Sequence, residues 1–135
     1  MKILVLDDDD FRHAYFVEQL SDTHDVTTTR TFDECIAALA SSKFDCVMLD
    51  HDLNNFKYVS VLQGPDCDLE ANGMDVCMFM IEMPKDLRPR QIIVHSKNKE
   101  RGDDMVSVLR CAGFDNVTRW EFNPTVNLST KKVKR

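Results

Sequence analysis

Residues 2–10 read KILVLDDDD, four apolar residues after Lys2 and then four aspartates. An unbroken apolar run of this kind is typical of a strand buried on both faces, as in a parallel sheet. The same order recurs in residues 46–52, CVMLDHD, and in residues 92–96, IIVHS. Because the carboxyl ends of parallel strands meet at one edge of a sheet, where ligands bind, we expect these polar residues to form one site.

The acidic residues of this expected site indicate a metal. Asp7 to Asp10 follow the first apolar run, and Asp50 and Asp52 follow the second. Carboxylates gathered in one place repel one another unless a hard divalent cation joins them. Mg²⁺ is typically held by one or two carboxylates together with phosphate oxygens. The sequence therefore predicts a metal-assisted phosphoryl site.

Strand and helix patterns alternate along the chain. The first helix is expected at residues 11–20, with Asp9 or Asp10 as its N-cap and an apolar face made of Phe11, Ala14, Tyr15, Val17 and Leu20. Further helices are predicted after the Thr31–Glu34 capping box, at 73–83, and at 101–111 with Gly113 as its C-cap. Strands are predicted at residues 2–6, 26–29, 44–49, 91–94 and 117–122. Repeated β-α units predict a parallel sheet with helices on both faces.

Length and cysteine content fit one cytoplasmic domain. A chain of 135 residues can bury a real core without staples. It opens on a strand and not on a secretory signal, and no apolar run approaches the ~20 residues that span a bilayer. Five cysteines without a C-x-x-C pair are typical of reduced core thiols.

Charge is uneven along the chain. The formal net charge is −6, yet Lys131 to Arg135 hold four basic residues and no acid. An acidic body argues against broad nucleic-acid binding. We expect a domain at residues 1–124 and a basic tail at 125–135, which either contacts RNA or is simply solvated.

One segment, residues 53–72, shows no convincing period. Loops of this length inside a compact domain are usually functional or disordered. The segment leaves the strand that carries Asp50, so it begins at the mouth of the expected pocket. We interpret it as a lid or a substrate-contacting loop, with a tolerated surface insertion as the alternative.

Several motifs resemble those of response-regulator receiver domains: Leu4 to Asp9, Phe44 to Asp50, Asn72 to Val76, and Ala112 to Asn116. The resemblance implies the flavodoxin-like fold, a five-stranded parallel sheet in the order 2-1-3-4-5. It also implies that Asp7 and Asp8 hold Mg²⁺ and that Asp50 accepts a phosphoryl group. The backbone carbonyl of Asp52 would complete the metal shell.

The chain departs from ordinary receivers at four points. Asn123 stands where receivers have a phosphate-binding lysine, and His95 precedes the small hydroxyl residue, Ser96, that ends the fourth strand. The loop after Asp50 is long. Residues 125–135 offer little apolar surface for a last helix, which we expect to be missing.

The combination of motifs is closer to a receiver-like family, the cyclic-phosphate-processing receiver domain. The matching segments are Leu6 to Asp9, Leu49 to Leu53, Asn72 to Asp75, and Val94 to Asn98. In that family the added histidines are proposed to let the acidic pocket act on cyclic or terminal phosphates. The resemblance therefore implies a Mg²⁺-dependent phosphoesterase or cyclic-phosphate hydrolase acting on a phosphorylated small molecule or nucleic-acid end.

Opening a cyclic phosphate needs a nucleophile, charge neutralisation and a proton for the leaving alkoxide. Asp50 or a metal-bound water would attack, and His95 with a near-neutral pKa would donate the proton. His51 is the second candidate, although a residue after a strand-end aspartate often points away from the crevice. Ser96 would donate a hydrogen bond to phosphate, and Lys97 would replace the charge lost at Asn123.

The other two histidines of the chain are assigned no function. His13 and His24 are expected to be surface residues without a role. Two other functions stay open: a stand-alone receiver, phosphorylated on Asp50 by a histidine kinase and acting on a protein partner, and an adaptor without chemistry.

Overall fold

The computed structural model describes residues 1–53 and 72–120. Its five strands form one parallel sheet in the order β2-β1-β3-β4-β5, which confirms the predicted flavodoxin-like fold. The elements in chain order are β1 (Lys2–Leu6), α1 (Asp10–Leu20), β2 (Asp25–Thr29), α2 (Phe32–Ser41), β3 (Cys46–Leu49), α4 (Gly73–Ile81), a 3-10 turn (Lys85–Leu87), β4 (Gln91–Val94), α5 (Lys99–Cys111) and β5 (Val117–Arg119).

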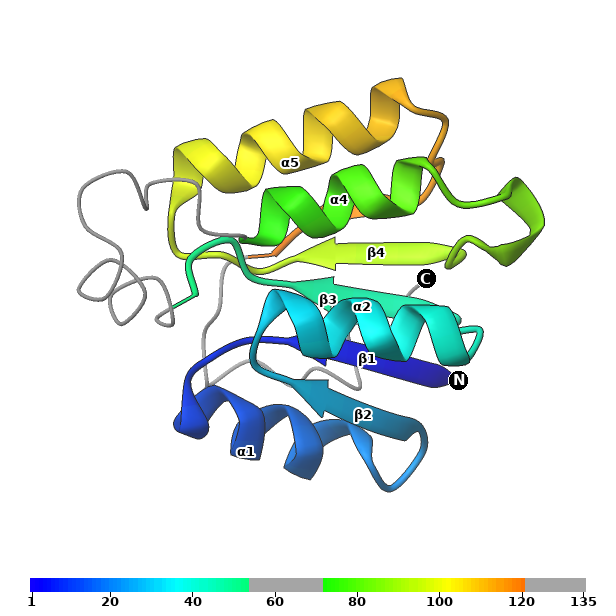
Figure 1. Cartoon of the computed structure of the whole chain (residues 1–135). Coiled ribbons are helices and arrows are strands. Elements are labelled where there is room, and N and C mark those ends of the chain that lie inside the picture. The colour runs from blue at the N-terminus through cyan, green and yellow to red at the C-terminus, as the bar shows by residue number, and fades with distance from the viewer. Residues whose placement is uncertain (54–71, 121–135) are drawn as a thin grey trace.

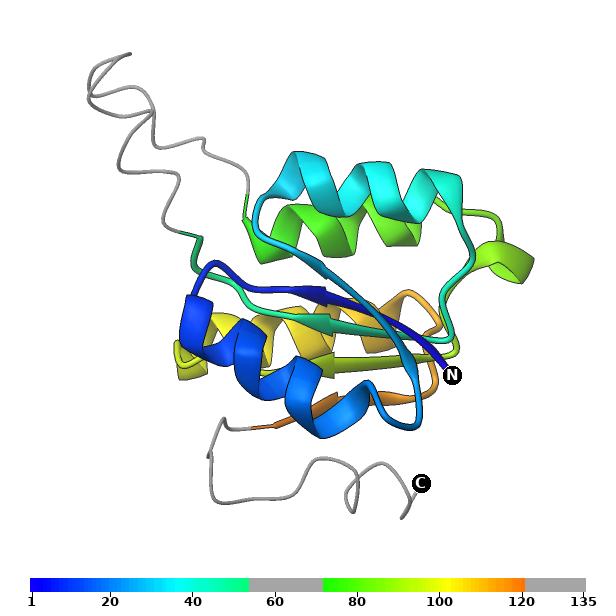
Figure 2. The same cartoon turned by 90° about the horizontal axis from the view of Figure 1, so that it is seen from below.

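The central strands bury both of their faces. Leu4 and Leu6 of β1 pack into a core cluster with α2, α4 and α5, whereas Ile3 and Val5 pack with Phe16 of α1. Strands β3 and β4 alternate in the same way, as a period of two requires. Figure 1 and Figure 2 show α2 and α4 together on one side of the sheet, with α1 on the other. Helices therefore lie on both faces.

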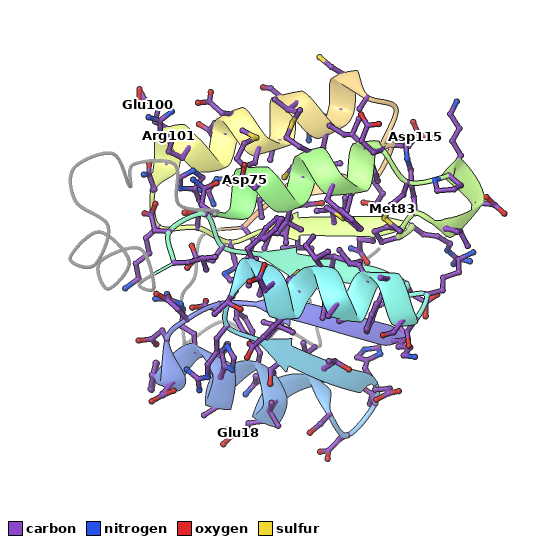
Figure 3. The ribbon with its side chains drawn as sticks, viewed as in Figure 1. Glu18, Asp75, Met83, Glu100, Arg101 and Asp115 are labelled. Carbon is purple, nitrogen blue, oxygen red and sulfur yellow. The ribbon has the colours of Figure 1, made fainter. Side chains whose placement is uncertain are left out.

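Each helix that starts at the carboxyl edge of the sheet has a side-chain cap at its N-terminus. Asp9 accepts from the backbone N–H of Arg12 at the start of α1, and Asn98 accepts from that of Arg101 at the start of α5. Asn72 and Asp75 form a capping box on α4. Figure 3 shows Asp75, Glu100 and Arg101 at this end of the molecule and Asp115 at the other. The helix N-termini and the strand ends thus share one edge.

Predicted boundaries differ from the observed ones by a few residues. Strand β3 starts at Cys46 and not at residue 44. Asp45 lies directly before it, where its backbone N–H donates to the Lys2 carbonyl oxygen and its carboxylate accepts from the backbone N–H of Lys2, both at 2.8 Å. Helix α4 ends at Ile81, two residues early, and α5 starts at Lys99, two residues early. Ala112 takes the C-cap of α5, and Gly113 follows it with a φ of 99°.

Helix α1 buries a different face from the predicted one. Phe11 and Val17 are exposed, whereas His13, Phe16 and Leu20 are buried. Both sets have helical spacing, but the observed one turns His13 and Phe16 towards the carboxyl edge of the sheet. The prediction that His13 is a surface residue was therefore wrong, because one of its ring nitrogens contacts the carbonyl oxygen of Asp7.

Three expectations fall outside the described residues: the long loop, whose described ends are Leu53 and Asn72, the last residues of β5 through 122, and the tail at 125–135 with its missing helix. Cys35, Cys46 and Cys77 are buried free thiols as predicted, whereas Cys111 is exposed. Across residues 1–53 and 72–120, no helix has the length and apolar character that crossing a membrane requires.

Candidate functional site

Three carboxylates meet at the carboxyl edge of the sheet. Asp7 and Asp8 follow β1, Asp50 follows the neighbouring β3, and one oxygen from each lies within 4.8 Å of the others. Asp7 is completely buried and Asp50 nearly so. The sequence predicted this meeting, because both aspartates directly follow strands that pair side by side.

An arginine that the sequence analysis missed lies inside this cluster. Arg12 of α1 donates to both oxygens of Asp7, from Nε at 2.6 Å and from Nη2 at 2.8 Å. Nη2 also lies 3.4 Å from Asp50 Oδ2 and 3.9 Å from Asp8 Oδ1. One guanidinium therefore contacts all three carboxylates. The sequence could have predicted this contact, because α1 starts directly after the aspartates that follow β1, and its first turn therefore lies close to the ends of the strands.

The cluster alters the acidity of Asp50. Burial raises the pKa of the Asp50 carboxyl to about 7, and the negative charges of Asp7 and Asp8 add to the effect. Arg12 and a hydrogen bond from the Ser96 side chain oppose it. In the absence of a further cation, Asp50 thus exchanges its proton close to neutral pH.

His95 lies beneath Asp7 and not in the open cleft. Its Nδ1 is 3.5 Å from Asp7 Oδ2, and its ring packs edge-on against Phe16 with centroids 5.0 Å apart. Its side chain is fully buried, and neither ring nitrogen has a hydrogen-bond partner among the described residues. Burial lowers the pKa of His95 to about 4, against the opposing pull of Asp7. The expected near-neutral pKa was wrong, since desolvation outweighs the single carboxylate.

A cleft of about 260 Å³ opens above the cluster, lined by Asp8, Asp9, Arg12, Asp50, Asp52 and Lys97. It is smaller than the 300 to 1,000 Å³ typical of pockets for drug-sized ligands, and it is large enough to admit a phosphate group. The Asp52 carboxylate, which is largely exposed, binds His51 Nδ1 at 2.7 Å. Lys97 is in the predicted position at the cleft, whereas Asn123 lies outside the described residues.

Two close contacts hold the loops of the site in place. Arg119 of β5 donates to the backbone oxygens of Ser96 at 2.6 Å and Val94 at 3.2 Å, and fixes the turn after β4. Ser96 is buried, and its Oγ accepts from the backbone N–H of Asn98 at 3.1 Å. A Cβ on Gly102 would lie 2.5 Å from Arg119 Nε, so glycine leaves the room that this guanidinium needs.

Gly73 makes the second close contact. Its backbone N–H donates to the carbonyl oxygen of His51 at 3.0 Å, and a Cβ there would lie 2.1 Å from the carbonyl oxygen of Asp50. The first residue of α4 therefore abuts the chain directly after β3. Only glycine allows this approach, which sets the path of residues 50–52 at the cleft.

The fold and the acidic edge together define a receiver-like domain. A family model described as "Cyclic-phosphate processing Receiver domain" matches residues 1–111. Since this match spans most of the chain, the chain belongs to that family, as its motifs predicted. No curated protein matches the chain.

Solved receiver structures share the fold. The BeF3-activated DrrB receiver domain is 24% identical, with a TM-score of 0.63, over 99% of this chain and 97% of that chain. A signal receiver domain from Vibrio parahaemolyticus is 18% identical, with a TM-score of 0.66 and coverages of 98% and 87%. A CheY-like receiver protein from Methanospirillum hungatei JF-1 is 20% identical, with a TM-score of 0.62 and coverages of 98% and 91%.

The donor set fits a hard divalent cation. Three carboxylates from two strand ends supply oxygen ligands of the type that Mg²⁺ prefers. The guanidinium of Arg12 among them shows that this position attracts positive charge. Asp7, Asp8 and Asp50 can thus hold a metal, as receivers do at an acidic cluster.

Proposed function

We propose that this protein is a Mg²⁺-dependent enzyme that processes cyclic or terminal phosphates of nucleotides or RNA. The observation that carries the proposal is the meeting of Asp7, Asp8 and Asp50 under a phosphate-sized cleft, in a chain of the cyclic-phosphate-processing family. Lys97 adds a cation at the rim of that cleft.

Asp7, Asp8 and Asp50, together with the backbone carbonyl of Asp52, would hold the metal. Bound there, Mg²⁺ supplies charge neutralisation for the phosphoryl oxygens. Without it the site repels its substrate, because five carboxylates line the cleft or lie directly beside it, and Arg12 and Lys97 are the cations that oppose them among the described residues of the cleft. The five are Asp7, Asp8, Asp9, Asp50 and Asp52.

Ring opening replaces one phosphorus–oxygen ester bond. Attack by the Asp50 carboxylate gives an acyl phosphate that water later hydrolyses, and attack by water gives the phosphomonoester directly. In both cases the expelled alkoxide takes up a proton. Ser96 and Lys97 are proposed to bind the phosphoryl oxygens, with Asn123 as a further contact.

The two histidines have different proposed roles. His95 is neutral at pH 7, so its proposed role is to donate a hydrogen bond from a neutral imidazole and to orient Asp7. His51 is the second candidate, since the carboxylate of Asp52, which lines the cleft, holds its ring by Nδ1. Such a histidine–carboxylate pair fixes the tautomer and the orientation of the ring.

The experiment is a substrate panel of cyclic mononucleotides, cyclic oligonucleotides and RNA ends, assayed with Mg²⁺. Because His95 is proposed to orient Asp7, which would hold the metal, His95→Ala should lose most turnover per folded molecule, and Asp50→Asn should lose it too. His24→Ala is the matched control, because His24 lies beside the amino terminus of the chain and far from the cleft. No turnover of any substrate by the wild type would contradict the proposal.

A stand-alone receiver is the second candidate. The acidic trio and the fold shared with a BeF3-activated receiver domain favour it. Labelling of Asp50 by acetyl phosphate, without turnover of the panel, would select this function. Absence of both reactions would leave an adaptor that binds a protein partner.

A further inference from the structure

One nitrogen atom, Nη2 of Arg12, lies where a shared cation would lie. It is 2.8 Å from Asp7 Oδ1, 3.4 Å from Asp50 Oδ2 and 3.9 Å from Asp8 Oδ1. We propose that Arg12 neutralises the acidic cluster in the metal-free protein, and that Mg²⁺ displaces its guanidinium into the cleft to bind the phosphoryl group. The inference rests on the proposed function and adds a phosphate-binding residue to it.

Arg12 and Mg²⁺ compete for the same oxygens. Both oxygens of Asp7 accept from Arg12, and Oδ1 also accepts from the backbone N–H of Asp9 at 2.9 Å. A Mg²⁺ ion held by Asp7 would share these oxygens with the guanidinium. Two adjoining cations in a largely buried site repel strongly, since little water screens them. Binding of one therefore requires movement of the other.

The cleft offers the displaced guanidinium a destination. Arg12 already lines it, entering from α1, while Lys97 enters from the turn after β4. These two are the cations among the described residues of the cleft. The planar fork of a guanidinium matches two phosphate oxygens better than an ammonium does. Asn123 is uncharged and stands where ordinary receivers have a phosphate-binding lysine. Arg12 would therefore supply the missing positive charge.

A purely structural role for Arg12 predicts different behaviour. If the ion pair only held α1 against the sheet, its loss would weaken folding and leave the metal site no better than before. Competition predicts instead that the same loss frees Asp7, Asp8 and Asp50 for Mg²⁺. The change in phosphate affinity at saturating Mg²⁺ separates the two roles without any measurement of catalysis, because only a guanidinium that moves into the cleft would bind the phosphate.

The test uses the full chain and two calorimetric titrations: MgCl2 alone, and inorganic phosphate at saturating MgCl2. We expect Arg12→Gln to bind Mg²⁺ on the order of tenfold more tightly than the wild type. The same variant should bind phosphate roughly tenfold to a hundredfold more weakly. Arg12→Lys keeps a positive charge without the planar fork, so its affinities for Mg²⁺ and phosphate should lie between those of the wild type and Arg12→Gln. It also replaces Arg12→Gln in the test if that variant does not fold.

Arg90→Gln is the control variant. Arg90 is exposed and precedes β4 at the opposite edge of the sheet. The substitution therefore removes the same charge at a position away from the acidic cluster. Equal or weaker Mg²⁺ binding by both Arg12 variants would overturn the proposal, and so would unchanged phosphate binding. A wild type that binds no Mg²⁺ would instead overturn the proposed function, which keeps the two failures apart.

Discussion

Replacing Asp50 with asparagine should make the metal-free protein more stable at pH 8, and the gain should vanish as the pH falls towards 4. The Asp50 pKa is about 7 in the folded protein and 3.8 in the unfolded chain. The unfolded chain therefore loses this proton first as the pH rises. The contribution of protonated Asp50 to the free energy of unfolding is therefore complete below pH 4 and is lost as the pH rises through 7. An asparagine at this position cannot ionise, so the variant does not lose stability in this way.

The size of the effect follows from the same two pKa values. A rise from 3.8 to about 7 corresponds to roughly 4 kcal/mol at pH 8, as an upper limit. That is a large part of the 5 to 15 kcal/mol that ordinarily separates folded and unfolded states. Half of this value would still move a urea midpoint by about 1 M.

Urea unfolding between pH 4.5 and 8, with a chelator present, measures the effect. The single tryptophan, Trp120, is buried and gives the fluorescence signal. Asp115→Asn is the control, because Asp115 is exposed at the opposite end of the sheet. A constant stability difference between Asp50→Asn and the wild type over this pH range would refute the reasoning. Added Mg²⁺ should reverse the order of the two proteins, since it stabilises only the form with the full set of carboxylates.

Three further outcomes are expected. The melting temperature of the wild type should climb with millimolar Mg²⁺, and Asp8→Asn should flatten the climb; no dependence in the wild type would remove the metal site. Gly73→Ala should cost about 1 to 3 kcal/mol in urea unfolding and weaken Mg²⁺ binding, because its Cβ would meet the Asp50 carbonyl at 2.1 Å; full stability would contradict that contact. Iodoacetamide should label exposed Cys111 well before Cys35, whose buried thiol has a pKa of about 12, as peptide mass spectrometry would show.

The fold was predictable because the three central strands are apolar on both faces. Such runs have few alternatives to a buried parallel strand, and polar residues directly after them must meet at one edge. The positions of Asp7 and Asp50 followed from this topology alone. Strand and helix ends were less predictable, since they depend on the last backbone hydrogen bonds of each element, which hydrophobic spacing does not specify.

The parts that sequence reasoning missed depend on the rotation of one helix. Phe11 and Val17 offered α1 an apolar stripe as good as the observed one, so hydrophobic spacing did not decide the face. The observed face buries Phe16 and Leu20 completely and also makes polar contacts, of His13 with the Asp7 carbonyl and of Arg12 with the acidic cluster. Similarly, the low pKa of His95 depends on complete burial against Phe16, which its position after a strand does not reveal.

The hydrogen bond between Gly73 and His51 makes the segment between them a natural place for inserted sequence. The chain leaves β3 and returns to the same spot, so the frame of the domain is closed before residue 54 and resumes at 72. Doubling the length of a flexible loop with fixed ends costs only about 0.6 kcal/mol. Variants of this protein with a longer sequence, or a grafted recognition sequence, between His51 and Gly73 should therefore keep the sheet unchanged.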